Sequence, residues 1–292
     1  MAIAVSLILN LGLLIIFKYS GFITQNINML LNTNFAVSKF ALPIGISFYT
    51  FQTISYTIDV YRGKTAVQHS FLNFLMYVSL YFQLVAGPIV RYSDIADQIE
   101  NRHEKIENVS NGLNRFCIGL TKKVIIANVA GKLSEPYLGG DFANLSIMGA
   151  WFGAILFTIQ IYYDFSGYSD MAIGLGNMFG FKFNENFNFP YISKTATEFW
   201  RRWHISLGSF FRDYVYIPLG GNRKNMYLNL FIVWFLTGLW HGASWNFVIW
   251  GMFYGGLITI EKIIGKNRIE KIPSVFLHGY LLLAVVIGWV IF

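Results

Sequence analysis

The chain has 292 residues, of which 55% are hydrophobic, 18% aromatic and only 13% charged, and its formal net charge is +7. Soluble domains carry about 25% charged residues. Together with a mean hydropathy of +0.48, the composition excludes an ordinary water-soluble fold and indicates an integral membrane protein. The single cysteine, Cys117, excludes an intrachain disulfide and a structural metal site built from several thiolates.

The positive charge is distributed along the chain rather than gathered in one tract. Basic pairs such as Lys122-Lys123 and Arg223-Lys224 flank apolar runs, as the positive-inside bias of membrane proteins requires. No RNA-binding signature or long basic tract is present, so nucleic acid is not an expected partner. Membrane lipid is the expected partner of the basic residues.

The first apolar run, residues 3–17, is followed by Lys18. It has neither a basic leader nor a small-residue cleavage site, so it indicates a membrane span rather than a signal peptide. It is shorter than the about 20 residues of a full crossing.

Eight apolar segments are long enough to cross or enter a bilayer. They lie near 1–18, 40–58, 71–90, 112–130, 147–163, 226–241, 244–264 and 275–292. The second segment contains Ser47, Thr50, Gln52 and Ser55, so it is expected to face protein or a water-filled cavity rather than lipid. Residues 91–111 are polar and predict an external loop or an interfacial helix. We expect a single all-α membrane domain over residues 1–292.

Residues 164–224 are rich in glycine, asparagine and aromatic residues. This composition predicts irregular backbone around a protein-walled cavity, followed by a short interfacial or re-entrant helix over 199–217. Candidate N-caps are Ser193, Thr195 and Thr197. Helical spacing would place Trp200, His204, Leu207 and Phe211 on one stripe and would let Glu198 pair with Arg202.

Of the five histidines, His69 and His103 lie in polar surroundings and His278 begins the last apolar run, so all three are expected to be structural or exposed. His241 lies within a long apolar tract and is preceded and followed by Gly238 and Gly242. Continuous helix would place Thr237 and Trp245 one turn to either side of it. A buried neutral imidazole can accept a proton from a hydroxyl, but the pattern equally fits a packing histidine.

His204 follows two arginines and is as compatible with an interfacial structural role as with catalysis. No His-x-x-x-His or Glu-x-x-His pattern is present, so no metal site is expected. A serine nucleophile elbow and a phosphate-binding loop are also missing from the sequence, which argues against ordinary serine hydrolase chemistry and ATP-driven transport.

Several long motifs occur together in this chain. They are 199–207 (FWRRWHISL), 212–223 (RDYVYIPLGGNR), 238–243 (GLWHGA), 48–56 (FYTFQTISY), 86–92 (AGPIVRY) and 164–170 (DFSGYSD). In their order along the chain, these motifs resemble those of the membrane-bound O-acyltransferases, and within them the alginate O-acetyltransferase (AlgI-like) branch. The resemblance covers essentially the whole chain. Because family members usually carry further spans at both ends, it also implies a chain truncated at both ends.

The resemblance implies a multi-span helical bundle around a central funnel or tunnel, with interfacial or re-entrant helices. His241 occupies the position of the family's essential histidine, and His204 that of its second functional position. His241 would act as general base or would carry the acyl group covalently. Trp203 and Trp240 would shape the tunnel with His204, and Asn246 is a candidate oxyanion donor.

Three arginines, Arg201, Arg202 and Arg212, would attract an anionic donor such as coenzyme A, although anionic lipid headgroups explain them equally well. The implied activity is transfer of an acyl group, with acetyl favoured, from a cytoplasmic thioester to hydroxyls of an extracytoplasmic polysaccharide, as in alginate biosynthesis. The donor would be acetyl-CoA or an acyl carrier protein, with no tightly bound cofactor.

A second, extracytoplasmic acetyltransferase is an expected partner, and the cell membrane is the expected location, with several spans. Three alternatives stay open. The same fold could transfer D-alanyl groups to teichoic acid, the chain could be a non-catalytic glycan or acyl transporter, or it could be a scaffold for a soluble transferase.

Overall fold

The computed structural model describes residues 2–38, 40–84, 87–103, 105–140, 142 and 145–292. Throughout these ranges the regular secondary structure is helical, which confirms the predicted all-α class. The α-helices are α1 (Ala2–Leu14), α2 (Ser20–Leu31), α3 (Ile46–Tyr61), α4 (Phe71–Ser79), α5 (Tyr81–Leu84), α6 (Tyr92–Asn101), α7 (Ile106–Thr121), α8 (Asn128–Leu138), α9 (Ile147–Met178), α10 (Ala196–Arg202), α11 (Ile205–Phe211), α12 (Met226–His241), α13 (Trp245–Ile264), α14 (Lys266–Ile269) and α15 (Ser274–Ile291). Three π-helical turns, Ile15–Tyr19, Lys122–Ala127 and Arg212–Tyr216, and a 3₁₀ turn, Pro190–Ile192, lie between them.

Three helical stretches among the described residues are long and apolar enough to cross a membrane: Ile3–Leu31, Trp245–Ile264 and Ser274–Ile291. Large apolar side chains on the first of them face outward; Ile8 is 70% exposed and Leu30 is 77% exposed. Such a surface is a liability in water but is stable against lipid tails. The protein is therefore a multi-pass membrane protein, as predicted.

The first span does not end at Lys18, so that predicted boundary is wrong. The chain passes through the π-helical turn Ile15–Tyr19 and continues as α2 to Leu31. The charge is tolerated inside the span because the Lys18 amino group bonds to Ser47 and to the carbonyl of Trp240 within the protein.

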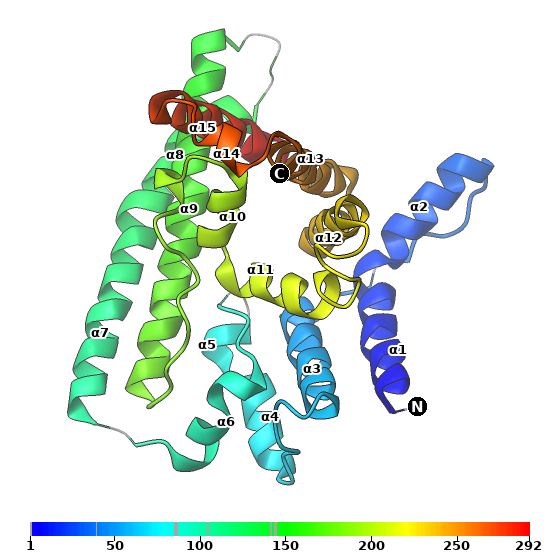
Figure 1. Ribbon diagram of the computed structural model, residues 1–292, viewed down its shortest axis with the longest axis vertical. Coiled ribbons are helices and arrows are strands. Elements are labelled where there is room, and N and C mark those ends of the chain that lie inside the picture. Colours follow the sequence, from blue (N-terminus) through cyan, green and yellow to red (C-terminus); the bar gives the residue numbers. More distant parts are fainter. Residues whose placement is uncertain (1, 39, 85–86, 104, 141, 143–144) are drawn as a thin grey trace.

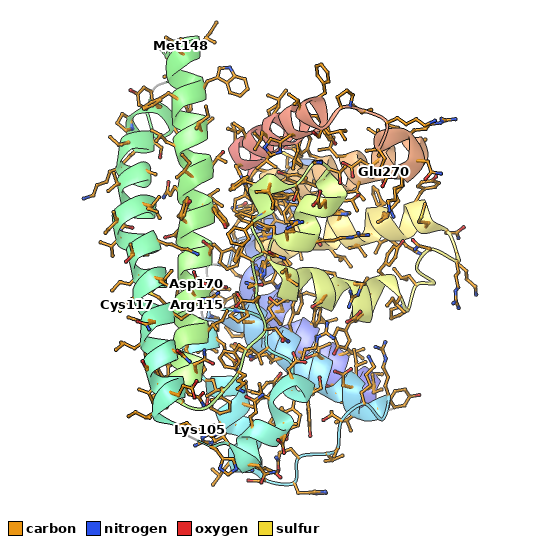
Figure 2. All side chains as sticks on the ribbon, turned by 60° about the vertical axis from the view of Figure 1, so that its left-hand side comes forward. Lys105, Arg115, Cys117, Met148, Asp170 and Glu270 are labelled. Atoms are coloured by element: carbon orange, nitrogen blue, oxygen red, sulfur yellow. The ribbon has the colours of Figure 1, made fainter. Side chains whose placement is uncertain are left out.

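Helices α7 and α9 run side by side along one flank of the molecule (Figure 1). Their backbones approach closely at Gly112 and Gly174, where a Cβ on Gly112 would lie 2.5 Å from the Gly174 carbonyl oxygen. Asp170 and Arg115 meet between the two helices (Figure 2), and the Asp170 carboxylate also accepts a 2.6 Å bond from Lys122.

The irregular backbone predicted from residue 164 onward is wrong for residues 164–178, which extend α9. The polar side chains there are compatible with helix because they find partners on neighbouring segments. Asp164 pairs with Lys123, Asp170 with Arg115 and Lys122, and Ser169 with Asn186. Irregular backbone begins only after Met178.

The single helix predicted over 199–217 is also wrong. Helix α10 ends at Arg202 and α11 begins at Ile205, and His204 between them has a left-handed backbone with φ of +45°. The break is held from outside, because Asn188 N–H bonds to the Arg202 carbonyl and Ile205 N–H bonds to the Asn186 carbonyl, each at 2.9 Å. The predicted stripe through His204 therefore does not form.

Two local predictions for this region are confirmed. The Thr195 hydroxyl caps α10 by accepting a 3.1 Å bond from the Glu198 N–H, and Glu198 pairs with Arg202 at 2.9 Å. Ser193 and Thr197 do not act as N-caps of this helix.

The other apolar segments are largely helical with shifted or interrupted ends, and their entry into the membrane stays a prediction. The second begins as helix only at Ile46, after Gly45 with φ of +77°, and its Thr50, Gln52 and Ser55 are buried in protein as predicted. Segment 71–90 breaks after Ser79, and its residues 85 and 86 lie outside the described residues. The polar stretch 91–111 contains the amphipathic α6.

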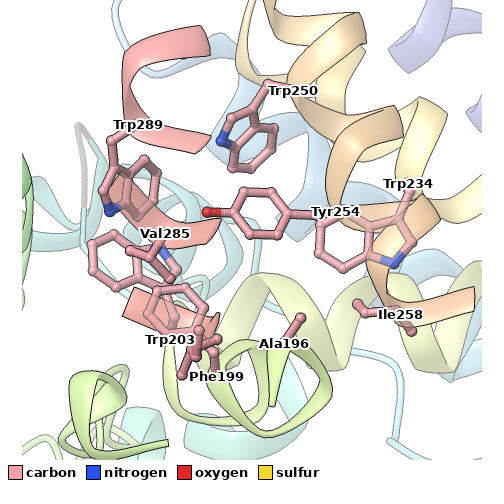
Figure 3. Close-up of a cluster of buried hydrophobic side chains, with 10 residues drawn as sticks. Ala196, Phe199, Trp203, Trp234, Trp250, Tyr254, Ile258, Val285 and Trp289 are labelled. Carbon is pink, nitrogen blue, oxygen red and sulfur yellow. The ribbon is translucent and has the colours of Figure 1, made fainter. Parts of the chain in front are cut away.

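An aromatic cluster joins α10, α12, α13 and α15 (Figure 3). Trp250 and Tyr254 are fully buried at its centre, and Trp200, Trp234 and Trp289 pack around them. Gly238 and Gly251 allow α12 and α13 to approach this closely, because a Cβ on Gly251 would meet the Trp234 carbonyl. One side of this cluster forms a wall of the site described next.

Candidate active site

Two histidines from separate elements face one cavity of about 350 Å³. His204 lies at the break between α10 and α11, and His241 is the last residue of α12. The cavity is lined by Lys18, Ser47, Phe48, Ile161, Asp164, Phe165, Trp203, His204, Trp240, His241, Trp250, Trp289 and Phe292.

His204 is 2% exposed, and a polar network holds its ring. Its Nδ1 lies 3.1 Å from Oδ1 of Asn186, which is itself buried. Phe165 packs edge-on against the imidazole at 4.7 Å between ring centroids. The other ring nitrogen, Nε2, is buried in the cavity wall and has no hydrogen-bond partner among the described residues.

His241 is positioned by the end of α12 and by rings around it. The preceding carbonyls, of Leu239 and Trp240, accept bonds from Tyr19 Oη (2.6 Å) and from Lys18 Nζ. Rings of Trp250 and Phe292 stand nearly perpendicular to the imidazole at 4.8 and 5.1 Å.

The Nε2 of His241 is buried and, within the described ranges, also has no hydrogen-bond partner. Other buried side-chain atoms among the described residues also lack a partner, and two of them, Nε1 of Trp240 and of Trp250, belong to the same cavity lining. Unsatisfied buried polar atoms call for an explanation, of which a ligand in the cavity is one. Two unpartnered imidazole nitrogens in one small cavity provide sites for proton transfer between reacting groups.

The structure brings four of the predicted site residues together, namely Trp203, His204, Trp240 and His241. Asn246 lies outside this lining; it is exposed and donates to the Phe292 carbonyl at 3.0 Å. Trp245 does not follow His241 on the same helix, because Gly242 ends α12 and Trp245 begins α13.

The three arginines also lie elsewhere. Arg201 lines a separate cavity of about 860 Å³ beside Lys194 and Lys262. Arg202 bonds to Glu198 and to the Asn188 carbonyl, and Arg212 bonds to Asp213. The roles of these residues in binding remain predictions.

The remaining histidines are placed away from the cavity lining. His69 and His103 are exposed, and His278 Nδ1 lies 3.0 Å from the Ser193 carbonyl. Within the described residues, no three His, Cys, Asp or Glu side chains gather as metal ligands, and the expectation of a metal-free site stays a prediction.

Sequence reasoning missed Lys18, Ser47, Asp164 and Trp250 as lining residues. One signal was available, because Lys18 is the only charged residue between Ile3 and Leu31. An ionisable residue inside a span is costly and marks a functional site by default. No comparable signal distinguishes Trp250 from the other tryptophans.

Comparison with known proteins agrees with this architecture. The model of the membrane-bound O-acyltransferase family, MBOAT, matches residues 19–291. A probable alginate O-acetylase AlgI of Pseudomonas aeruginosa is 46% identical over 284 residues, covering 94% of this chain and 54% of that protein.

The names of more distant relatives give other acceptors of the acyl group. A peptidoglycan O-acetyltransferase of Helicobacter pylori is 38% identical over 88% of this chain and 54% of its own length. A teichoic acid D-alanyltransferase of Streptococcus thermophilus is 29% identical over 77% of this chain and 58% of its own length. The chain thus spans a little more than half the length of these relatives. Because the family model covers nearly all of it, the chain belongs to the membrane-bound O-acyltransferase family.

Proposed function

We propose that the protein is an O-acyltransferase that moves an acyl group, acetyl in the first instance, from a thioester to a hydroxyl of an extracytoplasmic polysaccharide. The observation that carries this proposal is the pair of buried, unpartnered Nε2 atoms of His204 and His241 in one cavity. The named relatives support an envelope polysaccharide as acceptor. Acetyl is favoured over D-alanyl because the O-acetylating relatives are 38–46% identical and the D-alanyl-transferring one is 29% identical.

The proposed reaction begins at His241. Its Nε2 takes the proton of the acceptor hydroxyl while that oxygen attacks the thioester carbonyl carbon, so a C–O bond forms and the carbonyl oxygen becomes negative. Collapse of this tetrahedral intermediate breaks the C–S bond, and the thiolate takes the proton from His241 and leaves as a thiol. The products are the ester and the free thiol, and no redox partner or tightly bound cofactor is needed.

His204 would assist from the same cavity lining, with Trp203 and Trp240 confining the acyl group. The cavity volume of about 350 Å³ is near the lower limit of small-molecule pockets. It suits the reacting end of a thioester and one sugar hydroxyl rather than a whole coenzyme. We therefore place the body of the donor, acetyl-CoA or an acyl carrier protein, on the cytoplasmic side, with only its thioester in the cavity.

Residues 1–292 would act as one membrane domain in this scheme, since the cavity takes side chains from the first span and from α15. A second, extracytoplasmic acetyltransferase would act on the same polymer, as the resemblance to the alginate O-acetyltransferase branch implies. Both statements rest on the acyl-transfer proposal.

The test is to replace His241 by Ala in the gene of the source cell and to measure ester-linked acyl groups on its extracellular polysaccharide. The matched control is His69→Ala, at an exposed histidine. We expect the esters to disappear in the first variant and to persist in the second, at equal abundance in the membrane. Mass analysis of the lost group separates acetyl from D-alanyl. Unchanged esters in His241→Ala would overturn the enzyme proposal and favour the transporter or scaffold.

A further inference from the structure

Lys18 is a cation in the middle of the first span, with no other charged residue between Ile3 and Leu31. A lysine at such a position costs several kcal/mol of insertion free energy. Near a helix end its long side chain could reach the interface, but Lys18 instead turns into the protein and lines the cavity that holds His241. Its presence therefore requires a partner or a task inside the molecule.

The hydrogen-bond partners of Lys18 within the described ranges are both neutral. Its Nζ donates to the Trp240 carbonyl and, at 2.9 Å, to the Ser47 hydroxyl, and it lies 5.7 Å from the centre of the Trp240 ring. Asp164 is the carboxylate among the lining residues, and it pairs with Lys123. The described residues thus give Lys18 no carboxylate partner, and its charge is not neutralised by an ion pair.

A protonated amine has three N–H donors. Lys18 uses two of these N–H groups for its hydrogen bonds to the Trp240 carbonyl and the Ser47 hydroxyl. The third N–H group stays available on the Nζ atom, and Lys18 lines the cavity. The π-helical turn Ile15–Tyr19 contributes to this placement, and such turns are frequent at functional sites. An uncompensated cation with a spare donor stabilises negative charge that develops beside it.

We propose that Lys18 is a further catalytic residue, whose Nζ stabilises the negative oxygen of the tetrahedral intermediate by hydrogen bonding and charge. This inference rests on the acyl-transfer function proposed above. When the acceptor oxygen attacks, the carbonyl π electrons move to the carbonyl oxygen, and Lys18 donates a hydrogen bond to it. When the C–S bond breaks, those electrons return to the carbonyl, so Lys18 neither gains nor loses a proton.

Lys18 also holds the Trp240 carbonyl, so a purely structural role must be separated from charge stabilisation. Tyr19 provides the matched control, because its hydroxyl holds the neighbouring Leu239 carbonyl at 2.6 Å but does not line the cavity. Lys18→Gln retains a side-chain donor for the carbonyl and removes the charge, whereas Lys18→Arg retains the charge.

The experiment uses the full gene product in membrane vesicles of the source cell, with labelled acetyl-CoA as donor and acetyl esters on the polysaccharide as the readout. Removing one oxyanion donor lowers kcat by about 100- to 1,000-fold, and we expect this for Lys18→Met and Lys18→Gln with KM nearly unchanged. Lys18→Arg should be at least about tenfold faster than Lys18→Gln, because it keeps a cationic donor. Tyr19→Phe should lower kcat much less than Lys18→Gln does, since it loses a single neutral hydrogen bond and no charge at the cavity.

The outcomes separate the two proposals. If His241→Ala is inactive while Lys18→Gln transfers acetyl at the wild-type kcat, the role of Lys18 is overturned and the enzyme function stands. If Tyr19→Phe is as impaired as Lys18→Gln, Lys18 acts only by holding the backbone. If wild type transfers no acetyl from acetyl-CoA in vesicles and no ester forms in cells, both proposals fall. Should Lys18→Met fail to accumulate, the Arg and Gln variants still decide the question at equal abundance.

Discussion

His204 Nδ1 donates to Asn186 Oδ1 across 3.1 Å, and this bond determines which ring nitrogen faces the cavity. The amide orientation of Asn186 is fixed independently, because the same Oδ1 accepts the Ser206 backbone N–H at 3.1 Å and Nδ2 donates to Ser169. Because the accepting oxygen of Asn186 faces Nδ1 of His204, the proton of the neutral imidazole must be on Nδ1. Nε2 of His204 therefore carries the lone pair.

The first prediction concerns this orientation. Asn186→Leu should lower acyl transfer by about 10- to 100-fold, as removal of the outer hydrogen-bond partner of a metal-bound histidine does, because His204 loses its tautomer and Ser206 N–H is left unpaired. Initial rates of ester formation at equal membrane abundance provide the measurement. Asn188→Leu, two residues away and exposed, is the control and should retain activity. A wild-type rate in Asn186→Leu would show that the orientation of His204 is unimportant.

The second prediction concerns Glu261, whose buried carboxylate accepts the N–H groups of Ala196 and Thr197 at 2.6 and 2.9 Å. These groups begin α10, which ends at Arg202, directly before Trp203 and His204. Glu261→Gln replaces one accepting oxygen by a donor, and an unsatisfied buried group costs about 1–3 kcal/mol. The unfolding midpoint in detergent should fall accordingly. The control is Glu270→Gln, whose exposed pair with Lys266 should be worth less than about 1 kcal/mol; equal losses in both variants would contradict the prediction.

Sequence patterns predicted the parts of the fold that depend on local periodicity. Apolar helices such as 226–241 agree with the structure residue for residue, because lipid and core contacts select the same side chains along the whole helix. The break at His204 was not predictable in this way. It depends on backbone bonds from Asn186 and Asn188, which lie far enough away in sequence that no local pattern reports them.

The sequence also predicted only part of the candidate site, because some of its residues are placed by contacts between distant segments. The family motifs identified His204, His241 and their neighbouring tryptophans, all of which line the cavity. Lys18 is absent from the predicted site because a lysine after an apolar run is typical of the end of a span, whereas its contacts are with Ser47 and Trp240. Asn246 has the right chemistry for an oxyanion donor, but the end of α12 at Gly242 moves it out of the lining.

The third prediction is a pH dependence at Asp213. Burial raises the pKa of this carboxyl, but hydrogen bonds from Arg212 and Arg91 outweigh it and hold the pKa below the ordinary value of 3.8. A pKa lowered by folding stabilises the protein above the unfolded value, and this contribution is lost as the pH falls through the folded pKa. Asp213→Asn should therefore lower the unfolding midpoint at neutral pH, and its deficit should shrink below pH 3.8. Thermal unfolding of both proteins across this range is the measurement, and a deficit that does not change with pH would contradict the assignment.

The fourth prediction concerns the close contact between α7 and α9. A Cβ on Gly174 would lie 2.6 Å from the Gly112 carbonyl oxygen and 2.7 Å from Phe116 N, both of them backbone atoms that cannot rotate away. Gly174→Ala must separate the helices, and overpacking of this kind costs about 1–3 kcal/mol. Gly256→Ala, on the exposed face of α13 with no atom within 4 Å of the added Cβ, should instead gain about 0.5–1 kcal/mol from helix propensity. Opposite shifts of the two unfolding midpoints relative to wild type are the expected result. If Gly174→Ala were as stable as Gly256→Ala, the two helices could not pack at this distance in the membrane.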